Sequence, residues 1–327
     1  MLPSFFKKLG PISINQIKSK IDCRIVNLTG EETYDNFVSV NNINSNSLIF
    51  LYDNESIKNK LLNKVSVVCT KNKIKELSSN QKIIIVENVQ KSVAILSNIF
   101  YRDLNDNEKI NLKKPSIGKN CEIGNNVVIE NGVIIGNNVK INHGTVIKHN
   151  CIIGDRTEIG SNTTISNSIF GEDIYIGSNT SIGQRGFGFH INKNNNLNIF
   201  HTGRVLLKSK VSIGSGCTID RGSFSDTIIG NNTYLDNLCH VAHNVEIGKN
   251  CAFAAMTGIA GSARVGNNVL TGGQAGIAGH IKIGNNVRIA AKSGVFNSIG
   301  DGEQVMGNPA INQYKFIKNY KKIYGKK

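Results

Sequence analysis

A six-residue pattern of aliphatic and polar positions dominates the middle of the chain. From Ile117 onward an aliphatic side chain recurs at every sixth position, and glycine often follows it. The first run comprises Ile117, Ile123, Ile129, Ile135, Ile141, Ile147, Ile153, Ile159 and Ile165, and the second comprises Ile229, Leu235, Val241, Ile247, Phe253, Ile259, Val265, Thr271, Ile277, Ile283, Ile289 and Val295. A period of six fits neither an α-helix nor an isolated amphipathic strand. It predicts a left-handed parallel β-helix of hexapeptide repeats, in which three repeats form one coil of a triangular prism.

The residue four places after each aliphatic position is also expected to face inward, close to a corner of the prism. Five of the seven cysteines fall at this position: Cys121, Cys151, Cys217, Cys239 and Cys251. Because this gives them a packing role, we expect no metal or redox chemistry from them. An odd number of cysteines without CxxC pairs also fits a reducing compartment.

Interruptions of the repeat divide the chain into parts. The N-terminal part lacks the pattern and is typical of an α/β domain, with strands expected over 47–52, 65–70 and 82–87 and helices over 55–63 and 90–101. The sequence therefore predicts a small α/β domain over 1–112, a β-helix over 113–308 and a short basic helix over 309–327. An excursion loop over 184–206 interrupts the β-helix, and long excursions from a compact solenoid are commonly functional.

The chain is strongly basic, with 38 Lys and Arg against 23 Asp and Glu and a formal net charge of +15. This charge suits an acidic partner, although a chain rich in Lys, Asn and Ile together is also what an AT-rich genome produces. No apolar stretch reaches the roughly 18–20 residues of a membrane span. The first residues carry their charges after the apolar ones, the reverse of a signal peptide. We therefore expect a cytoplasmic protein without an integral membrane segment.

The C-terminal segment is expected to form a basic amphipathic helix. Lys315, Lys318, Lys321 and Lys322 alternate there with aromatic and aliphatic residues. The helix is expected either to cover the end of the prism or to dock an acidic protein. Nucleic-acid binding would need basic residues along a whole face with interleaved aromatics, so we expect no nucleic-acid partner.

Two histidines are expected on one face of the prism. His243 and His280 are separated by two coils plus one residue, and Gly258 and Gly261 between them predict a groove of exposed backbone. A histidine beside such a groove is a candidate general base, and Asp236 is a candidate partner for its imidazole.

A zinc site is the competing interpretation, because γ-class carbonic anhydrases use the same type of prism. Such a site needs three histidines that converge tetrahedrally. His240 falls at a corner and His280 lies two coils from His243, so we expect no metal site.

Several short motifs occur in an order that is more specific than the hexapeptide repeats. They are Thr218-Ile-Asp-Arg-Gly222, Asp226-Thr-Ile-Ile-Gly230, Asp236-Asn237, Ala242-His-Asn244, Gly279-His280 and Gly186-Phe-Gly-Phe189. In these motifs, and over nearly its whole length, the chain resembles the UDP-3-O-acylglucosamine N-acyltransferases of lipid A biosynthesis.

The resemblance implies a homotrimer with active sites in clefts between neighbouring prisms. The donor would be a 3-hydroxyacyl thioester on acyl carrier protein, and the acceptor would be the 2-amino group of UDP-3-O-acylglucosamine. His243 would be the general base, Asp236 would orient it, and His280 would assist the oxyanion or the pantetheine. No cofactor is implied apart from the phosphopantetheine of the carrier protein, whose arm the glycine groove would admit. The four C-terminal lysines would bind the acidic carrier protein.

The resemblance also implies contacts with the UDP-sugar lipid precursor. Phe50 matches the first of two aromatic residues that stack on uracil, whereas Ser56 stands where the second is expected and leaves Tyr52 as the nearest candidate. The further candidates for substrate binding are Phe187, Phe189, His201 and Asn237, with Gly258 and Gly261 in the groove. The excursion also lacks the family's Pro-Gln pair before its Gly-Arg.

Two alternative functions remain open. The same fold serves UDP-N-acetylglucosamine O-acyltransferases and sugar acetyltransferases, which generally begin almost directly with the repeats and lack the N-terminal domain. A non-catalytic β-helix scaffold would need neither the two histidines nor the Phe-rich excursion.

The acyl-chain length depends on what closes the far end of the lipid groove, for which Phe296 or its neighbours are candidates.

Overall fold

The computed structural model describes residues 4–38, 46–53 and 65–325. The chain divides into two compact units. The solenoid unit comprises Asn105–Phe187 and Gly203–Lys327 together with the N-terminal residues up to Phe5, and the α/β unit comprises Phe6–Leu104 and Gly188–Thr202. The tip of the predicted excursion, Gly188–Thr202, thus belongs to the α/β unit.

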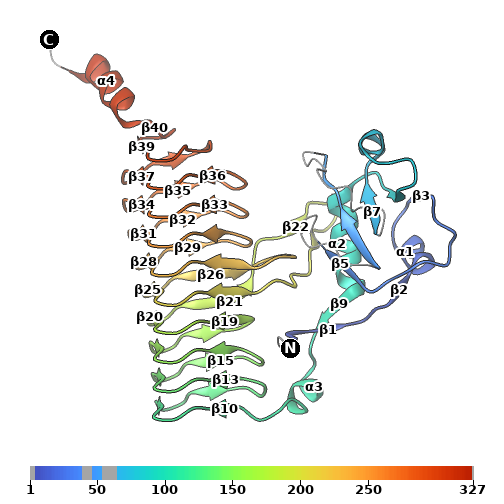
Figure 1. Ribbon diagram of the computed structural model, residues 1–327, viewed down its shortest axis with the longest axis horizontal. Helices are drawn as coiled ribbons and strands as arrows, with labels where there is room; N and C mark the ends of the chain where they lie inside the picture. Colours follow the sequence, from blue (N-terminus) through green and yellow to red (C-terminus); the bar gives the residue numbers. More distant parts are fainter. Residues whose placement is uncertain (1–3, 39–45, 54–64, 326–327) are drawn as a thin grey trace. The chain divides into compact units, whose positions relative to one another are not determined.

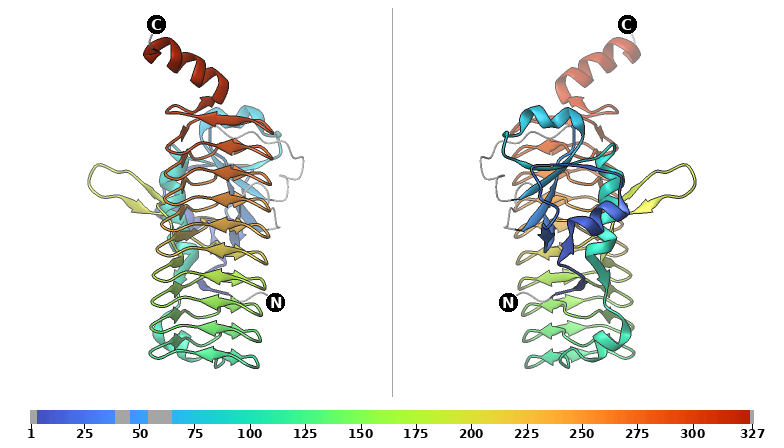
Figure 2. Two further views of the ribbon diagram at one scale, coloured as in Figure 1. Left: turned by 90° about the vertical axis from the view of Figure 1, so that its left-hand side faces the viewer. Right: turned by 90° about the vertical axis from the view of Figure 1, so that its right-hand side faces the viewer.

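Short parallel strands build the solenoid unit as a stack of coils (Figures 1 and 2). In its described part they form three sheets, each named here after its first strand, and the last strand of the β11 sheet, β40 (Ile311–Asn312), is antiparallel to β39 (Gln304–Met306). The β10 sheet comprises β10 (Ser116–Ile117), β13 (Ile134–Ile135), β16 (Ile152–Ile153), β19 (Ser168–Phe170), β24 (Val205–Leu207), β27 (Thr227–Ile229), β30 (Glu246–Ile247), β33 (Arg264–Val265) and β36 (Lys282–Ile283). The β11 sheet comprises β11 (Glu122–Ile123), β14 (Lys140–Ile141), β17 (Glu158–Ile159), β20 (Tyr175–Ile176), β25 (Ser212–Ile213), β28 (Tyr234–Leu235), β31 (Ala252–Phe253), β34 (Leu270–Thr271), β37 (Arg288–Ile289), β39 (Gln304–Met306) and β40 (Ile311–Asn312). The β12 sheet comprises β12 (Val128–Ile129), β15 (Val146–Ile147), β18 (Thr164–Ile165), β21 (Ser181–Arg185), β26 (Thr218–Arg221), β29 (His240–Val241), β32 (Gly258–Ile259), β35 (Gly276–Ile277) and β38 (Gly294–Val295).

The strand register follows the hexapeptide repeat. Ile117 pairs with Ile135, and Ile135 pairs with Ile153, each one coil further along the chain. The aliphatic positions point inward and are buried, except at the open N-terminal end, where no coil precedes Ile117 and Ile123. Asparagines with positive φ turn many of the corners, since asparagine tolerates this conformation better than most residues. The predicted parallel β-helix is therefore confirmed.

The inward cysteines behave as small core residues. Cys151, Cys217, Cys239 and Cys251 are buried, whereas Cys121 in the first coil is partly exposed. Burial raises the pKa of the Cys151 thiol to about 12, which disfavours the reactive thiolate.

The α/β unit is built around a mixed sheet with the strand order β3-β8-β7-β6-β5. Its elements are β1 (Phe6–Lys8), β2 (Ile12–Ser13), α1 (Ile14–Lys20), β3 (Arg24–Val26), β4 (Thr33–Tyr34), β5 (Asn36–Val38), β6 (Ser47–Phe50), β7 (Ser66–Cys69), the 3₁₀-helix η2 (Lys71–Glu76), β8 (Lys82–Ile85), α2 (Val89–Phe100), β9 (Tyr101–Asp103), β22 (Phe189–His190) and β23 (Leu197–Asn198). Strands β5 to β8 run parallel, and β3 is antiparallel to β8. The strands expected over 47–52, 65–70 and 82–87 correspond to β6, β7 and β8, and the helix over 90–101 corresponds to α2. The helix expected over 55–63 lies outside the described residues.

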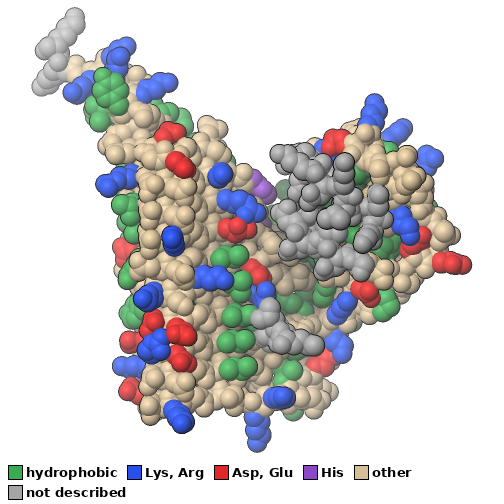
Figure 3. Space-filling model, viewed as in Figure 1, with side chains coloured by type: hydrophobic (Ala, Val, Ile, Leu, Met, Phe, Trp, Pro, Cys, Tyr) green, Lys and Arg blue, Asp and Glu red, His purple; other side chains and the backbone are tan. Residues whose placement is uncertain are grey.

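Two helices flank the repeats of the solenoid unit, α3 (Asp106–Ile110) before them and α4 (Gln313–Tyr324) after them. Helix α4 is the predicted basic C-terminal helix. Its lysines, Lys315, Lys318, Lys321 and Lys322, are all exposed, and basic side chains gather on this end of the unit (Figure 3).

Glu32 connects the turn at Thr29 and Gly30 with strand β8 of the α/β unit. Its carboxylate accepts hydrogen bonds from the backbone N–H groups of Thr29 and Gly30, both at 3.0 Å, and lies 3.4 Å from Lys82 Nζ on β8. Burial raises the pKa of this carboxyl, but the hydrogen bonds and Lys82 outweigh burial and lower the pKa to about 2.

We expect Glu32→Gln to destabilise the α/β unit by about 1–2 kcal/mol at pH 7. A carboxyl whose pKa is lowered on folding stabilises the folded state above its unfolded pKa and loses this effect as the pH falls toward 2. The difference between variant and wild type should therefore shrink from pH 6 to pH 3. Amide hydrogen exchange of β4 and β8 measures it, with the exposed neighbour Glu31→Gln as the control. An equal difference at both pH values would contradict the assignment.

Candidate functional site

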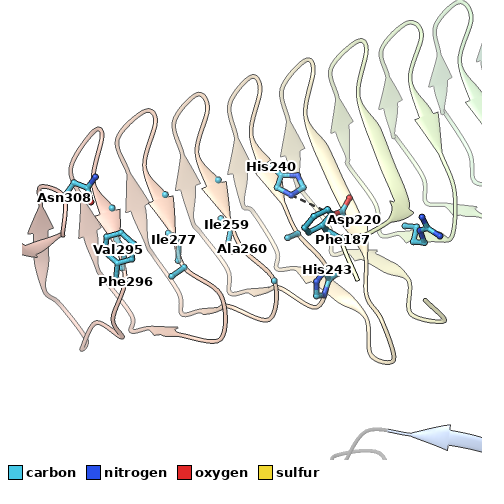
Figure 4. A pocket seen from close by; sticks show the side chains of 18 residues that line it. Phe187, Asp220, His240, His243, Ile259, Ala260, Ile277, Val295, Phe296 and Asn308 are labelled. Carbon is cyan, nitrogen blue, oxygen red and sulfur yellow. Dashed lines mark ion pairs between the residues drawn. The ribbon is translucent and has the colours of Figure 1, made fainter. Parts of the chain in front are cut away.

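A cavity of about 910 Å³ lies along the outer face of the β12 sheet (Figure 4). Residues from successive coils line it, beginning with Arg185, Phe187 and Asp220 and ending with Phe296 and Asn308. Its lining includes glycines and small side chains, among them Ala242, Ala260 and Ala278. The polar groups are concentrated at the end where His240, His243 and Asp220 lie.

Glycines in register form the floor of the cavity. His240 pairs with Gly258 in the next coil, Gly258 with Gly276, and Gly276 with Gly294. A Cβ atom at Gly258 or Gly276 would meet no atom within 4 Å, so the floor is open above these two residues. With strands about 4.8 Å apart, the three steps from His240 to Gly294 span roughly 14 Å.

The floor is blocked at its far end. A Cβ atom at Gly294 would lie 2.5 Å from Asn308 Oδ1 and 3.3 Å from the ring of Phe296. Both backbone groups of Gly294 are paired with the segment after β39, because its N–H donates to Gly307 and its carbonyl accepts from Ala310. Phe296 and Asn308 thus limit the length of the cavity.

Asp220 and His240 occupy the polar end of the cavity. Oδ2 of Asp220 lies 3.8 Å from Nε2 of His240, and Nδ1 of His240 lies 2.7 Å from the Thr218 hydroxyl. Burial of Asp220 raises its pKa, while the charges of His240, His243 and Arg221 act in the opposite direction. The carboxyl therefore binds a proton more readily than an exposed aspartate does.

His243 follows β29 at a corner of the prism and lies against the next coil. A Cβ atom at Gly261 would come within 2.8 Å of Cε1 and 2.9 Å of Nε2 of the imidazole. Its Nδ1 lies 2.9 Å from Oδ1 of Asn244. A glycine at position 261 is thus needed for the imidazole to lie at this position.

Asp236 and Asn237 do not line the cavity that holds His243. They follow β28 in the β11 sheet, whereas His243 follows β29 in the β12 sheet, one corner further along the chain. Asp236 lines a second cavity, of about 440 Å³, with Tyr234, Phe253 and Leu270. Asn237 accepts a hydrogen bond from the Ser215 N–H and donates one to Asp236.

His280 lies on the same edge of the prism as His243 but in the neighbouring column. One coil below His243 is Gly261 and two coils below is Gly279, so His280 stacks in the column of Asn244 and Ser262 instead. All three of these residues have positive φ, between 61° and 63°. His280 is exposed and does not line the cavity.

Four further predicted residues fall in the α/β unit. Phe50 lies in β6 and is only 5% exposed, with its ring centroid 5.9 Å from that of Phe37. Tyr52 and Phe189 are half-buried, and His201 is buried beside Gly188. A cavity of about 500 Å³ in this unit is lined partly by basic residues such as Lys20, Arg24, Lys71 and Lys91, and by none of these four. Phe187, in the solenoid unit, is 83% exposed at the cavity edge.

Sequence reasoning did not single out Asp220, Gly276, Gly294 or Asn308. A signal was present for the two glycines, because Gly258, Gly276 and Gly294 follow one another at intervals of one coil. Asp220 lies within the motif Thr218-Ile-Asp-Arg-Gly222. Its proximity to His240 depends on the pairing of Thr218 with His240 in the next coil, which the regular period of 18 does not predict. In the described ranges no group of three His, Cys, Asp or Glu side chains is placed to hold a metal ion, and no helix is long and apolar enough to cross a membrane.

Comparisons with protein families match the repeats. The bacterial transferase hexapeptide family (six repeats) matches residues 226–261 and 262–297, and the GMPPB C-terminal domain family matches residues 107–189.

Curated relatives match a shorter segment at higher identity. UDP-3-O-acylglucosamine N-acyltransferase of Caulobacter vibrioides is 56% identical over 55 residues, which are 17% of this chain and 16% of the relative. The protein of the same name from Bradyrhizobium diazoefficiens is 52% identical over 59 residues, which are 18% and 17% of the two chains. The matched segment is thus about a sixth of the length of these relatives.

Two of the solved structures that match this chain are named as acyltransferases. The UDP-N-acetylglucosamine acyltransferase of Arabidopsis is 22% identical, with a TM-score of 0.48 over 65% of this chain and 74% of that chain. The enzyme of the same name from Campylobacter jejuni is 19% identical, with a TM-score of 0.47 over 65% and 84%.

Proposed function

Because the chain is built of hexapeptide repeats and shares a homologous segment with UDP-3-O-acylglucosamine N-acyltransferases, we propose that it is an N-acyltransferase of lipid A biosynthesis. It transfers a 3-hydroxyacyl chain from acyl carrier protein to the 2-amino group of UDP-3-O-acylglucosamine. The observation that carries the proposal is a single cavity in which His243 lies at one end of a glycine-floored apolar track.

In the proposed reaction the neutral amine attacks the thioester carbonyl. A C–N bond forms, the C–S bond breaks, and the proton lost by the nitrogen passes to His243 and then to the departing sulfur. An imidazole is suited to this transfer because the ordinary pKa of a histidine side chain lies close to neutral pH, so it can both accept and release a proton. His280 lies exposed near the same edge, and its assistance to the oxyanion or the pantetheine stays a prediction.

The track above Gly258 and Gly276 is proposed to bind the acyl chain of the donor. Its floor is backbone and its walls are small aliphatic side chains, so an alkyl chain loses contact with water without displacing a polar group. Phe296 and Asn308 set the length that fits. The pantetheine arm then enters from the end where His243 lies.

The site is proposed to be completed in a homotrimer. Asp236 and His243 lie at different corners of one prism, so a contact between them needs a second copy. The cavity of Asp236 lies beside exposed apolar side chains of the β11 sheet, where Tyr234 is 52% and Leu270 is 40% exposed. A contact between two different faces of identical chains closes into a ring when the rotation permits.

The acyl carrier protein is proposed to dock at α4. Lys315, Lys318, Lys321 and Lys322 are exposed there and suit an acidic partner. The α/β unit is proposed to bind the nucleotide, with Phe50, Tyr52, Phe189 and His201 as candidates for that contact. The protein is proposed to act in the cytoplasm, where acyl carrier protein and UDP-sugars are available.

We expect purified protein to form an amide from hydroxyacyl carrier protein and UDP-3-O-acylglucosamine, and His243→Gln to lower kcat by at least about 100-fold. Mass spectrometry of the product measures both. The control is His143→Gln, a solenoid histidine outside the cavity. An ester formed on UDP-N-acetylglucosamine would instead favour the O-acyltransferase alternative, and full activity of the His243 variant would refute its role as base.

The track also predicts a change in donor preference. A leucine in place of Gly276 fills the floor one coil before the blocked end, so Gly276→Leu should favour shorter acyl donors at the expense of longer ones. Competition between carrier proteins with different chains measures the preference. Lys282→Leu, an exposed substitution on the β10 sheet, is the matched control, and an unchanged preference in Gly276→Leu would place the acyl chain elsewhere.

Subunit mixing tests the completed site. If Asp236 of one copy serves His243 of another, Asp236→Asn and His243→Gln subunits assembled together in equal amounts recover about a quarter of the wild-type sites. The recovered activity is measured against each variant alone. No recovery in mixed assemblies would mean that the two residues do not meet between copies.

A further inference from the structure

We propose that Asn244 is a positioning residue that holds the imidazole of His243 in the form protonated at Nδ1, so that Nε2 is the nitrogen that takes the proton in transfer. Only one part of this inference rests on the proposed function, namely that Nε2 accepts a proton from the substrate. The geometry of Asn244 carries the rest of the argument.

The orientation of the Asn244 amide is fixed by two backbone groups. The N–H of Ser223 donates to Oδ1 at 2.9 Å, and Nδ2 donates to the carbonyl of Ser225 at 3.1 Å. A backbone N–H can only donate and a backbone carbonyl can only accept. Rotating the amide by 180° would therefore place two donors against each other at one end and two acceptors at the other.

The fixed amide determines the tautomer of the histidine. The atom 2.9 Å from Nδ1 of His243 is Oδ1, and an amide oxygen can only accept. Nδ1 must therefore carry the proton. In a neutral imidazole with its proton on Nδ1, the lone pair lies on Nε2, which faces the coil of Gly261 at the cavity.

Asn244 is itself fixed by further hydrogen bonds to its surroundings. Its backbone N–H donates to the Thr227 hydroxyl at 2.9 Å, and its Nδ2 also donates to the Ser225 hydroxyl at 2.8 Å. Its φ of 63° places it in the left-handed region, which asparagine tolerates better than most residues.

The loop over 222–226 that supplies these partners is itself anchored. Arg204 pairs with Asp226 through its guanidinium, with N···O distances of 2.7 and 3.1 Å, and also donates its backbone N–H to the same carboxylate. The N–H of Gly203 donates to the carbonyl of Gly222. The pair is largely shielded, with side-chain exposures of 22% and 19%, so the loop presents Ser223 and Ser225 in a defined position.

The tautomer can be observed directly, without activity. Solid-state NMR of protein labelled with [15N]histidine distinguishes Nδ1–H from Nε2–H imidazoles, and the spectrum of His243→Gln identifies the His243 signals. At pH 8 we expect His243 to be protonated at Nδ1 in the wild type and to populate both tautomers in Asn244→Ala. A wild-type His243 protonated at Nε2 would overturn the inference, whatever the activity.

Kinetics provide the second readout. Asn244→Ala should lower kcat roughly 10- to 100-fold with little change in KM. Asn244→Asp keeps an acceptor for Nδ1 and should restore much of kcat, but its charge stabilises the imidazolium and moves the acid limb of the activity profile to higher pH. The other charged groups around the imidazole, Asp220, Arg221, Arg185 and His240, are unchanged in both variants.

Asn268→Ala is the matched control, because Asn268 is an exposed asparagine with a φ of 57° at a different corner of the prism, away from His243. Equal losses in Asn244→Ala and Asn268→Ala would mean that the effect comes from the corner and would refute the positioning role. If Asn244→Ala does not fold, the tautomer of the wild type and the pH profile of Asn244→Asp still decide the matter. A Nδ1–H imidazole together with full activity of His243→Gln would confirm that Asn244 sets the tautomer but would refute the role of Nε2 as the proton acceptor in transfer.

Discussion

The stacking of each coil on its predecessor is the constraint on which the rest of the molecule depends. Backbone hydrogen bonds between coils fix which residues lie above one another, as Ile117 lies beside Ile135. The same register governs inward and outward positions. A register that stacks the aliphatic side chains in the core therefore also determines which outward residues lie next to one another on the surface. The outward column of His240, Gly258, Gly276 and Gly294 is a direct result, because it places one imidazole before a floor that is open at Gly258 and Gly276 and blocked at Gly294.

The polar end of the cavity lies where the regular coil is broken. Thr218 pairs with His240, 22 positions later, whereas regular coils pair residues 18 apart. The additional residues form the loop over 222–226, whose Ser223 and Ser225 bind the Asn244 side chain. The core aliphatic positions continue above and below this loop without change. The insertion therefore supplies polar partners to a surface that a regular repeat would leave uniform.

The repeat in the sequence predicted the β-helix, the inward placement of five cysteines, four of which are buried, and the groove at Gly258, because each depends only on the period. It could not predict the environment of His243, which depends on hydrogen bonds from an irregular loop. The expected alignment of His280 with His243 shows the limit of counting by period. One residue beyond two full coils moves His280 into the column of Asn244, next to the column of His243. Asp220 escaped notice because it and His240 lie in neighbouring coils that pair residues 22 positions apart, a spacing that the period of six does not predict.

A single prism separates groups that the proposed chemistry needs together. The three sheets face three directions, so the cavity of the β12 sheet and the cavity beside Asp236 on the β11 sheet cannot close on one another within one chain. In the proposed trimer, packing one face against the other face of a neighbouring copy would bring them together without any change in the coil. Each copy would then offer both faces, and a ring would use all of them. A triangular prism is thus well suited to sites that are shared between identical subunits, because its rigid corners fix the groups that must meet.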